Sequence, residues 1–181
     1  MRPAVKLWPC GCGYDESWTR ILVGAPELYP DLDNLNAIPS ILNVLAHDNT
    51  DIVVIVVQLL QDLTNPDVFE DDEESDEPAR VLVDVLVENN VLELLVQNLQ
   101  RLNDSNPDEM AAVYSTLTTV ENLVEVKPAV AEMVCERTKL LKWLLGKIKV
   151  REFDFWVLRL GFFFEIAKTK LLRLGRPSFF F

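Results

Sequence analysis

The groups in this chain best suited to metal binding or covalent catalysis are three cysteines and one histidine. Cys10 and Cys12 flank a glycine, which resembles half of a zinc site, and Cys135 and His47 are the other soft donors. A structural zinc needs four ligands, so this supply is short. With one histidine and no nucleophile–histidine or phosphate-loop arrangement, acid–base and nucleophilic catalysis have no candidate groups. We therefore expect a protein that is not an enzyme and has no metal or cofactor.

Carboxylates form the second chemically distinctive group, because seven of them are crowded into residues 70–77. Such a run attracts basic partners over a Debye length, but it is more often a solvated, disordered loop. We predict a solvated loop over residues 67–78, inserted between two helices. Its acidic residues are Glu70, Asp71, Asp72, Glu73, Glu74, Asp76 and Glu77.

Charge is distributed unevenly along the 181 residues, whose net charge is −12. Residues 25–136 hold 24 Asp and Glu against 3 Lys and Arg, whereas residues 137–181 hold 11 Lys and Arg against 3 Asp and Glu. An acidic body argues against direct nucleic-acid binding and favours the capture of basic peptides. The three cysteines give no disulfide framework, which favours a reducing compartment. The apolar stretch 155–164 is too short for a membrane span, which needs about 20 residues.

The spacing of apolar residues predicts the helices that position the charged and polar side chains. Ile38, Ile41, Leu42 and Leu45 have the spacing of one helix face. Residues 51–63 are ambiguous, because their β-branched run favours a strand while their length and spacing favour a buried helix, which we predict. Further on, Asn106 and Pro107 indicate a helix start, and Lys127-Pro128 indicates its end.

The helical pattern recurs. Segments beginning at Ile38, Val91 and Leu140 share the same apolar offsets and lie 53 and 49 residues apart. Armadillo-type units run about 40–47 residues, and the acidic insertion lengthens the first spacing. The prediction is an all-α, armadillo-like right-handed helical solenoid of about two and a half repeats over residues 25–154. An irregular lead, residues 1–24, precedes it, and a basic aromatic tail, residues 155–181, follows it.

Several stretches also resemble a known family. They are LNAIPSILNVLAHDNTDI, VVQLLQDLT, VLVDVLVENNVLELLVQNLQRLN, TLTTVENLVEVKP and LLKWLLGKIK. They are similar to the N-terminal region of the beta-catenin-like family, armadillo-type nuclear proteins associated with the spliceosome. The resemblance implies a nuclear, non-catalytic scaffold for pre-mRNA splicing. It also implies binding to basic localisation-type peptide segments, including those of a Cdc5-like component of the Prp19 complex.

The resemblance also implies candidate binding residues, because armadillo proteins grip extended peptides along the third helix of each repeat. In repeat register, Gln61-Asp62-Leu63 matches Glu121-Asn122-Leu123. Asn122 then takes the place of the amide that clamps a peptide backbone, and Asp62 replaces it one unit earlier. An ordinary solvated helix face is the alternative. The predicted partner-binding residues are Gln58, Gln61, Asp62, Thr118, Glu121 and Asn122.

The basic aromatic tail gives a second hypothesis, a membrane-associated or non-functional truncated product, because aromatic and basic residues together favour a membrane interface. We expect no membrane binding in the leading interpretation. The third unit, however, lacks a recognisable long helix to cover Leu140, Leu141 and Trp143. Exposed apolar edges promote association. We therefore expect self-association through the incomplete third repeat, with an oligomeric or poorly soluble chain.

Overall fold

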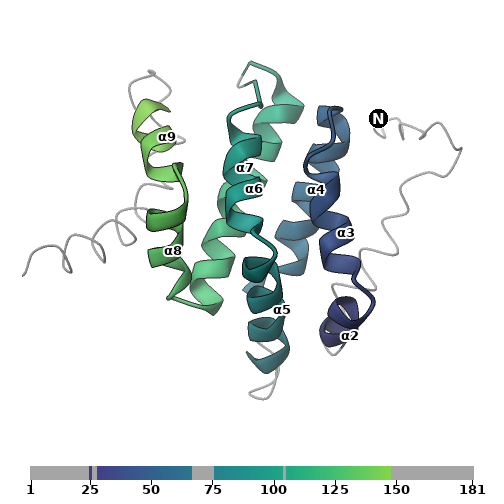
Figure 1. Cartoon of the computed structure of the whole chain (residues 1–181). Coiled ribbons are helices and arrows are strands. Elements are labelled where there is room, and N and C mark those ends of the chain that lie inside the picture. Colours follow the sequence, from purple (N-terminus) through teal and green to yellow (C-terminus); the bar gives the residue numbers. More distant parts are fainter. Residues whose placement is uncertain (1–24, 26–27, 67–75, 104, 148–181) are drawn as a thin grey trace, which may run out of the picture.

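The structure is a computed structural model that describes residue 25 and residues 28–66, 76–103 and 105–147. Its regular elements in these residues are all helices (Figure 1), which confirms the predicted all-α class. They are α2 (Tyr29–Asn34), α3 (Ala37–Val44), α4 (Thr50–Leu63), α5 (Asp76–Glu88), α6 (Val91–Leu99), α7 (Pro107–Val126), α8 (Val130–Arg137) and α9 (Leu140–Lys147).

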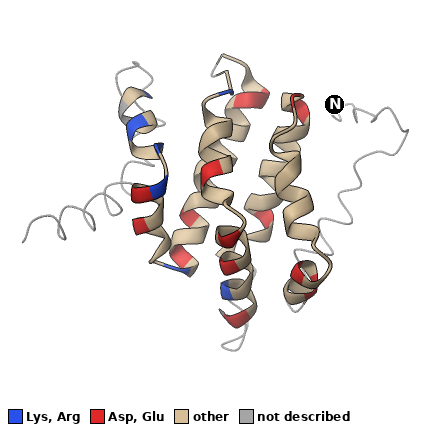
Figure 2. Ribbon diagram, in the orientation of Figure 1, with Lys and Arg blue, Asp and Glu red and all other residues tan. Residues whose placement is uncertain are grey.

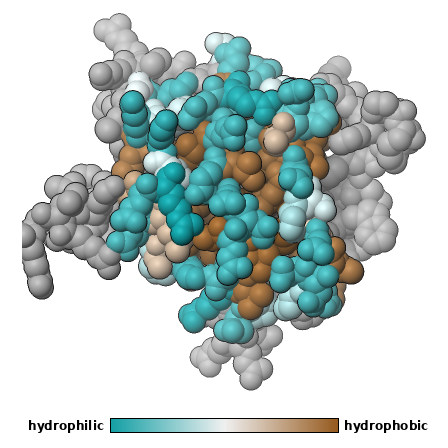
Figure 3. All heavy atoms as spheres, in the orientation of Figure 1, coloured by the Kyte–Doolittle hydropathy of each residue, from teal (hydrophilic) through white to brown (hydrophobic). Residues whose placement is uncertain are grey.

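The helices follow one another across the molecule in three groups, α2–α4, α5–α7 and α8–α9, from right to left in Figure 1. The predicted register is supported by burial, because its matched residues Ile38, Val91 and Leu140 are all buried in the same apolar core. The most extensive helix–helix contact joins α4 to α7, which are the long third helices of the first two groups. Apolar side chains show between hydrophilic ones on the face in Figure 3.

The ambiguous stretch at residues 51–63 is helical, as predicted. Asn49 caps α4, and its side-chain oxygen accepts a hydrogen bond of 2.9 Å from the backbone N–H of Asp51. Val53, Val57 and Leu60 are buried at helical spacing. Burial of this face against α7 outweighs the strand propensity of β-branched residues, which is a weak and context-dependent preference.

Helix α7 begins and ends at the predicted signals. The Asn106 side chain accepts from the Asp108 N–H at 3.1 Å, and its amide donates to Glu109 at 2.9 Å. Pro107 occupies the first turn, where its missing N–H costs nothing, and Lys127 is the C-cap. The Asn106 oxygen thus satisfies one of the unpaired N–H groups at the helix start, and Glu109 anchors the amide of the same side chain.

Two short features were not predicted. Helix α2 precedes Ile38, the first residue of the predicted helix face. Burial raises the pKa of the Tyr29 hydroxyl in α2 to about 12.

The residues before α3 and α6, Asn36 and Asn90, both have a left-handed backbone conformation, with φ of 51° and 60°. Asparagine tolerates this conformation, so the two residues are a further repeat signal.

The predicted acidic loop 67–78 was wrong at its C-terminal boundary. Helix α5 begins at Asp76, so Asp76, Glu77 and Pro78 lie in its first turn. Acidic residues favour the positive end of a helix, and proline is tolerated in the first turn, which explains the earlier start. The rest of the run, residues 70–75, lies outside the described residues, as do the lead 1–24 and the tail 155–181.

Candidate peptide-binding site

The candidate site is built on the packed pair of helices α4 and α7. Leu63 and Leu123, which end the two matched triplets, are both buried in the core. This supports the predicted register between the two helices. The polar residues of the triplets therefore differ in environment because of what surrounds each helix, rather than because the register is mistaken.

On α4, Gln58 and Asp62 are exposed and lie one turn apart on the same face, while Gln61 is half-buried. Desolvation raises the pKa of the Asp62 carboxyl above its usual value. Among the described residues, no hydrogen bond or ion pair joins this carboxylate to a cation. Asp62 is thus an acid that has lost part of its hydration and is accessible to an incoming positive charge.

On α7, Tyr114, Thr118 and Glu121 follow one another at helical spacing and reach the surface in part. The Thr118 hydroxyl donates to the Tyr114 carbonyl at 3.0 Å, which holds its side chain along the helix. Tyr114 was not predicted as part of the site, although its spacing four residues before Thr118 is a signal that the sequence contains. These residues give α7 a half-exposed polar and aromatic face.

Asn122 is placed differently from the sequence expectation. Its side chain is 6% exposed, and its amide donates at 3.3 Å both to the Gln61 carbonyl and to the Thr64 hydroxyl. Thr64 in turn donates to the Leu60 carbonyl at 2.8 Å. The Asn122 amide therefore ties α7 to the C-terminal end of α4. Gln61 and Asn122 are brought together by this contact, and Asn122 is not displayed to a partner in this structure.

A second unpredicted link joins the first two groups of helices at their loops. Arg101 donates to the His47 carbonyl at 2.9 Å, and His47 Nδ1 accepts from the Asn49 N–H at 3.0 Å. His47 thus lines the turn before α4. Arg101 was missed because nothing local in the sequence connects it to a loop 54 residues away.

The described part of the chain bears on two of the chemistries considered, metal binding and membrane insertion. Those residues contain no cluster of three or more His, Cys, Asp and Glu side chains arranged to hold a metal. Cys135 is a half-buried free thiol there, and Cys10 and Cys12 lie outside it. None of the described helices is long and apolar enough to cross a bilayer. The membrane hypothesis depends on the tail, which also lies outside, and stays a prediction.

The described part of the chain is all-helical, with the two long helices α4 and α7 packed against each other. The family described as catenin-beta-like, Arm-motif containing nuclear matches residues 17–159, and the chain belongs to this family. The match extends beyond both ends of the predicted repeat region, residues 25–154. It therefore includes part of the lead and part of the tail.

Individual relatives agree with this assignment. The chain is 45% identical to Beta-catenin-like protein 1 of Homo sapiens over 133 residues, which cover 72% of this chain and 23% of the relative. The Rattus norvegicus protein is 44% identical over the same shares of the two chains. The Beta-catenin-like protein 1 homolog of Schizosaccharomyces pombe is 32% identical over 132 residues, 73% of this chain and 22% of the relative. The chain thus spans less than a quarter of the length of these relatives.

Proposed function

We infer that this chain is a non-catalytic nuclear scaffold of the spliceosome that binds basic peptide segments of partner proteins. Membership of an Arm-motif nuclear family supports the nuclear location and the scaffold class. The three successive groups of helices support an armadillo-like right-handed solenoid of about two and a half repeats. A Cdc5-like component of the Prp19 complex, carrying a basic localisation-type segment, is the proposed partner.

The observation that carries the binding proposal is the state of Asp62. Its carboxylate is desolvated enough to raise its pKa, yet no described cation is paired with it. A lysine or arginine of a peptide would replace the lost hydration with a charge-assisted hydrogen bond. Gln58, one turn away on the same face, has both a donor and an acceptor for the peptide backbone.

Tyr114, Thr118 and Glu121 extend the proposed surface along α7. Glu121 supplies a second carboxylate, and Tyr114 supplies an aromatic face that can pack on a lysine or arginine side chain. Asn122 contributes indirectly, because it holds α7 against the end of α4. The proposal therefore separates residues that contact the peptide from a residue that positions them.

Fluorescence anisotropy with a labelled lysine- and arginine-rich peptide tests this proposal. We expect Asp62→Asn to weaken binding roughly 3–10-fold, as loss of a partly exposed ion pair implies. Asp51→Asn is the matched control, because Asp51 is an exposed carboxylate at the other end of the same helix. Binding should also weaken as salt increases.

Two results would contradict the proposal. One is a Kd that does not change with salt, because charge pairing could not then supply the affinity. The other is equal weakening by Asp62→Asn and Asp51→Asn, which would indicate a diffuse attraction to the acidic body rather than a site on α4. A melting curve for each variant separates loss of contact from loss of fold.

A further inference from the structure

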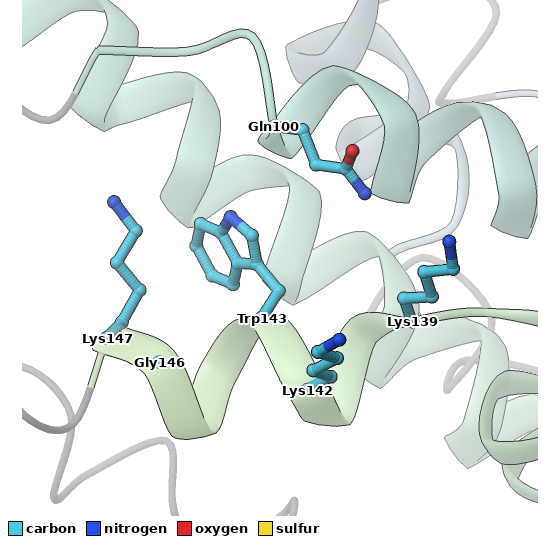
Figure 4. Close-up of a pocket in the computed structure, with 6 residues that line it drawn as sticks. All are labelled: Gln100, Lys139, Lys142, Trp143, Gly146 and Lys147. Atoms are coloured by element: carbon cyan, nitrogen blue, oxygen red, sulfur yellow. The ribbon is translucent and has the colours of Figure 1, made fainter.

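A shallow hollow of about 530 Å³ lies between helix α9 and the end of α6 (Figure 4). Gln100, the C-cap of α6, lines one side. The other side consists of α9 residues, with the Trp143 ring and the Lys147 side chain extending from the helix toward the opening. Its lining residues are Gln100, Lys139, Lys142, Trp143, Gly146 and Lys147.

The hollow is basic and open. Lys139 and Lys142 are exposed, and within the described residues neither is joined to a carboxylate by an ion pair. Lys147 Nζ lies 5.3 Å from the centre of the Trp143 ring, which is a cation–π distance. This contact holds a third ammonium group at the edge of the hollow. A Cβ built on Gly146 would meet no atom within 4 Å, so α9 leaves this side of the hollow unfilled.

This concentration of positive charge contrasts with the rest of the molecule. Figure 2 shows Lys and Arg gathered on α9 and at its junction with α8 and only scattered elsewhere, whereas Asp and Glu are spread over the other helices, α8 included. Residues 25–136 contain only three basic residues against 24 acidic ones. Favourable electrostatics at the hollow therefore requires an acidic occupant, and a nucleic acid would be repelled by the surrounding body.

We propose that the hollow on α9 binds the acidic run 70–77 of a second copy of this chain. The run carries seven carboxylates in eight residues, which is the strongest charge complement to three lysines that the sequence contains. Carboxylates would pair with Lys139 and Lys142 at the open side. Lys147, held over Trp143, would supply a third charge-assisted contact.

Chain connectivity favours the run of another copy over that of the same chain. Residues 67–75 are joined to the end of α4 and the start of α5, in the first two groups of helices. Helix α9 lies in the third group, and α6 and α7 stand between it and α4 (Figure 1). The hollow and the run are different surfaces, so the contact is compatible with two geometries: a head-to-tail chain of copies, or a dimer in which each copy places its run in the hollow of the other.

Sedimentation velocity of the full chain at low and high salt tests this contact. We expect concentration-dependent association at low salt that decreases as salt screens the charges. Lys139→Glu with Lys142→Glu should weaken it about tenfold or more, because like charges then face one another. For the single change Lys142→Glu, the matched control is Arg137→Glu, an exposed cation of α8 outside the hollow.

A charge exchange makes the test specific. Glu73→Lys with Glu74→Lys should also weaken association, and combining these changes with the two lysine reversals in one chain should restore it. Circular dichroism and melting confirm that each variant is folded.

A monomer at every concentration in low salt would overturn the proposal. So would association that persists in high salt and in the lysine variants, which would indicate the apolar edge of the third unit. Loss of association on deleting residues 155–181, with no effect of the lysine reversals, would assign the contact to the tail.

Discussion

Helices α4 and α7 are matched in the predicted register. The polar residue at the matched position nevertheless has a different role in each helix. Asp62 in α4 is exposed and has an elevated carboxyl pKa, whereas Asn122 in α7 is buried and bonded to α4. The following leucines, Leu63 and Leu123, are buried in both. The apolar position is thus the same in both helices, while its polar neighbour is exposed in α4 and bonds the two helices together in α7.

The buried leucines should give the largest effect and the most direct test of this equivalence. We expect Leu63→Ala and Leu123→Ala each to lower the free energy of unfolding by about 2–5 kcal/mol, the range for buried leucines. Chemical denaturation measures both. A cost for Leu63→Ala below about 1 kcal/mol, with the full cost for Leu123→Ala, would show that the end of α4 is not part of the common core.

Substitutions of the two polar residues, Asn122 and Asp62, should have different effects on stability. Asn122→Ala removes both donors to α4 and should destabilise the chain by about 1–3 kcal/mol, because buried acceptors lose their partner. Asp62→Ala, at the matched position, should leave stability unchanged or slightly higher, since it removes a desolvated charge. Thr64→Val isolates the bond to the threonine hydroxyl. Equal losses for Asn122→Ala and Asp62→Ala would erase the distinction between the two helices.

The helix caps provide a smaller comparison. Asn49→Ala and Asn106→Ala should each cost about 0.5–2 kcal/mol, because each removes a side-chain acceptor for an otherwise unpaired N–H. The loss should be larger at Asn106, whose amide also donates to Glu109. Thermal melts of the two variants measure the difference. A larger loss at Asn49 would indicate that the turn containing His47 contributes more to α4 than the cap bond itself.

The smallest expected effect is a pH dependence confined to α4. The pKa of the folded Asp62 carboxyl is raised above its usual 3.8 by desolvation, so the folded state holds the proton more tightly than the unfolded state does. Stability must then fall as pH rises from about that value through the folded pKa. Asp62→Asn should be slightly more stable than the parent above this window and equal to it below. A parent chain that gains stability relative to Asp62→Asn on raising the pH would show that the carboxylate has a cationic partner.

Local signals determined much of this protein from the sequence alone. The ends of α7 follow from Asn106-Pro107 and Lys127-Pro128, and the core positions of α3, α6 and α9 follow from apolar spacing, because both depend on residues near in the chain. The stretch 51–63 was the hardest local case, and its length and spacing identified it correctly as a helix.

Only the tertiary structure decided which polar residues remain available. Asn122 was expected at a binding surface, but the Gln61 carbonyl that binds it belongs to another repeat, and no local pattern encodes that distance. The hollow on α9 likewise requires Gln100 of α6 beside Trp143. Periodicity identifies the side of a helix that is buried, because burial is shared by all repeats. Whether a polar side chain is exposed or bonded depends on the single group that packs against it, and that group is determined only when the helices pack together.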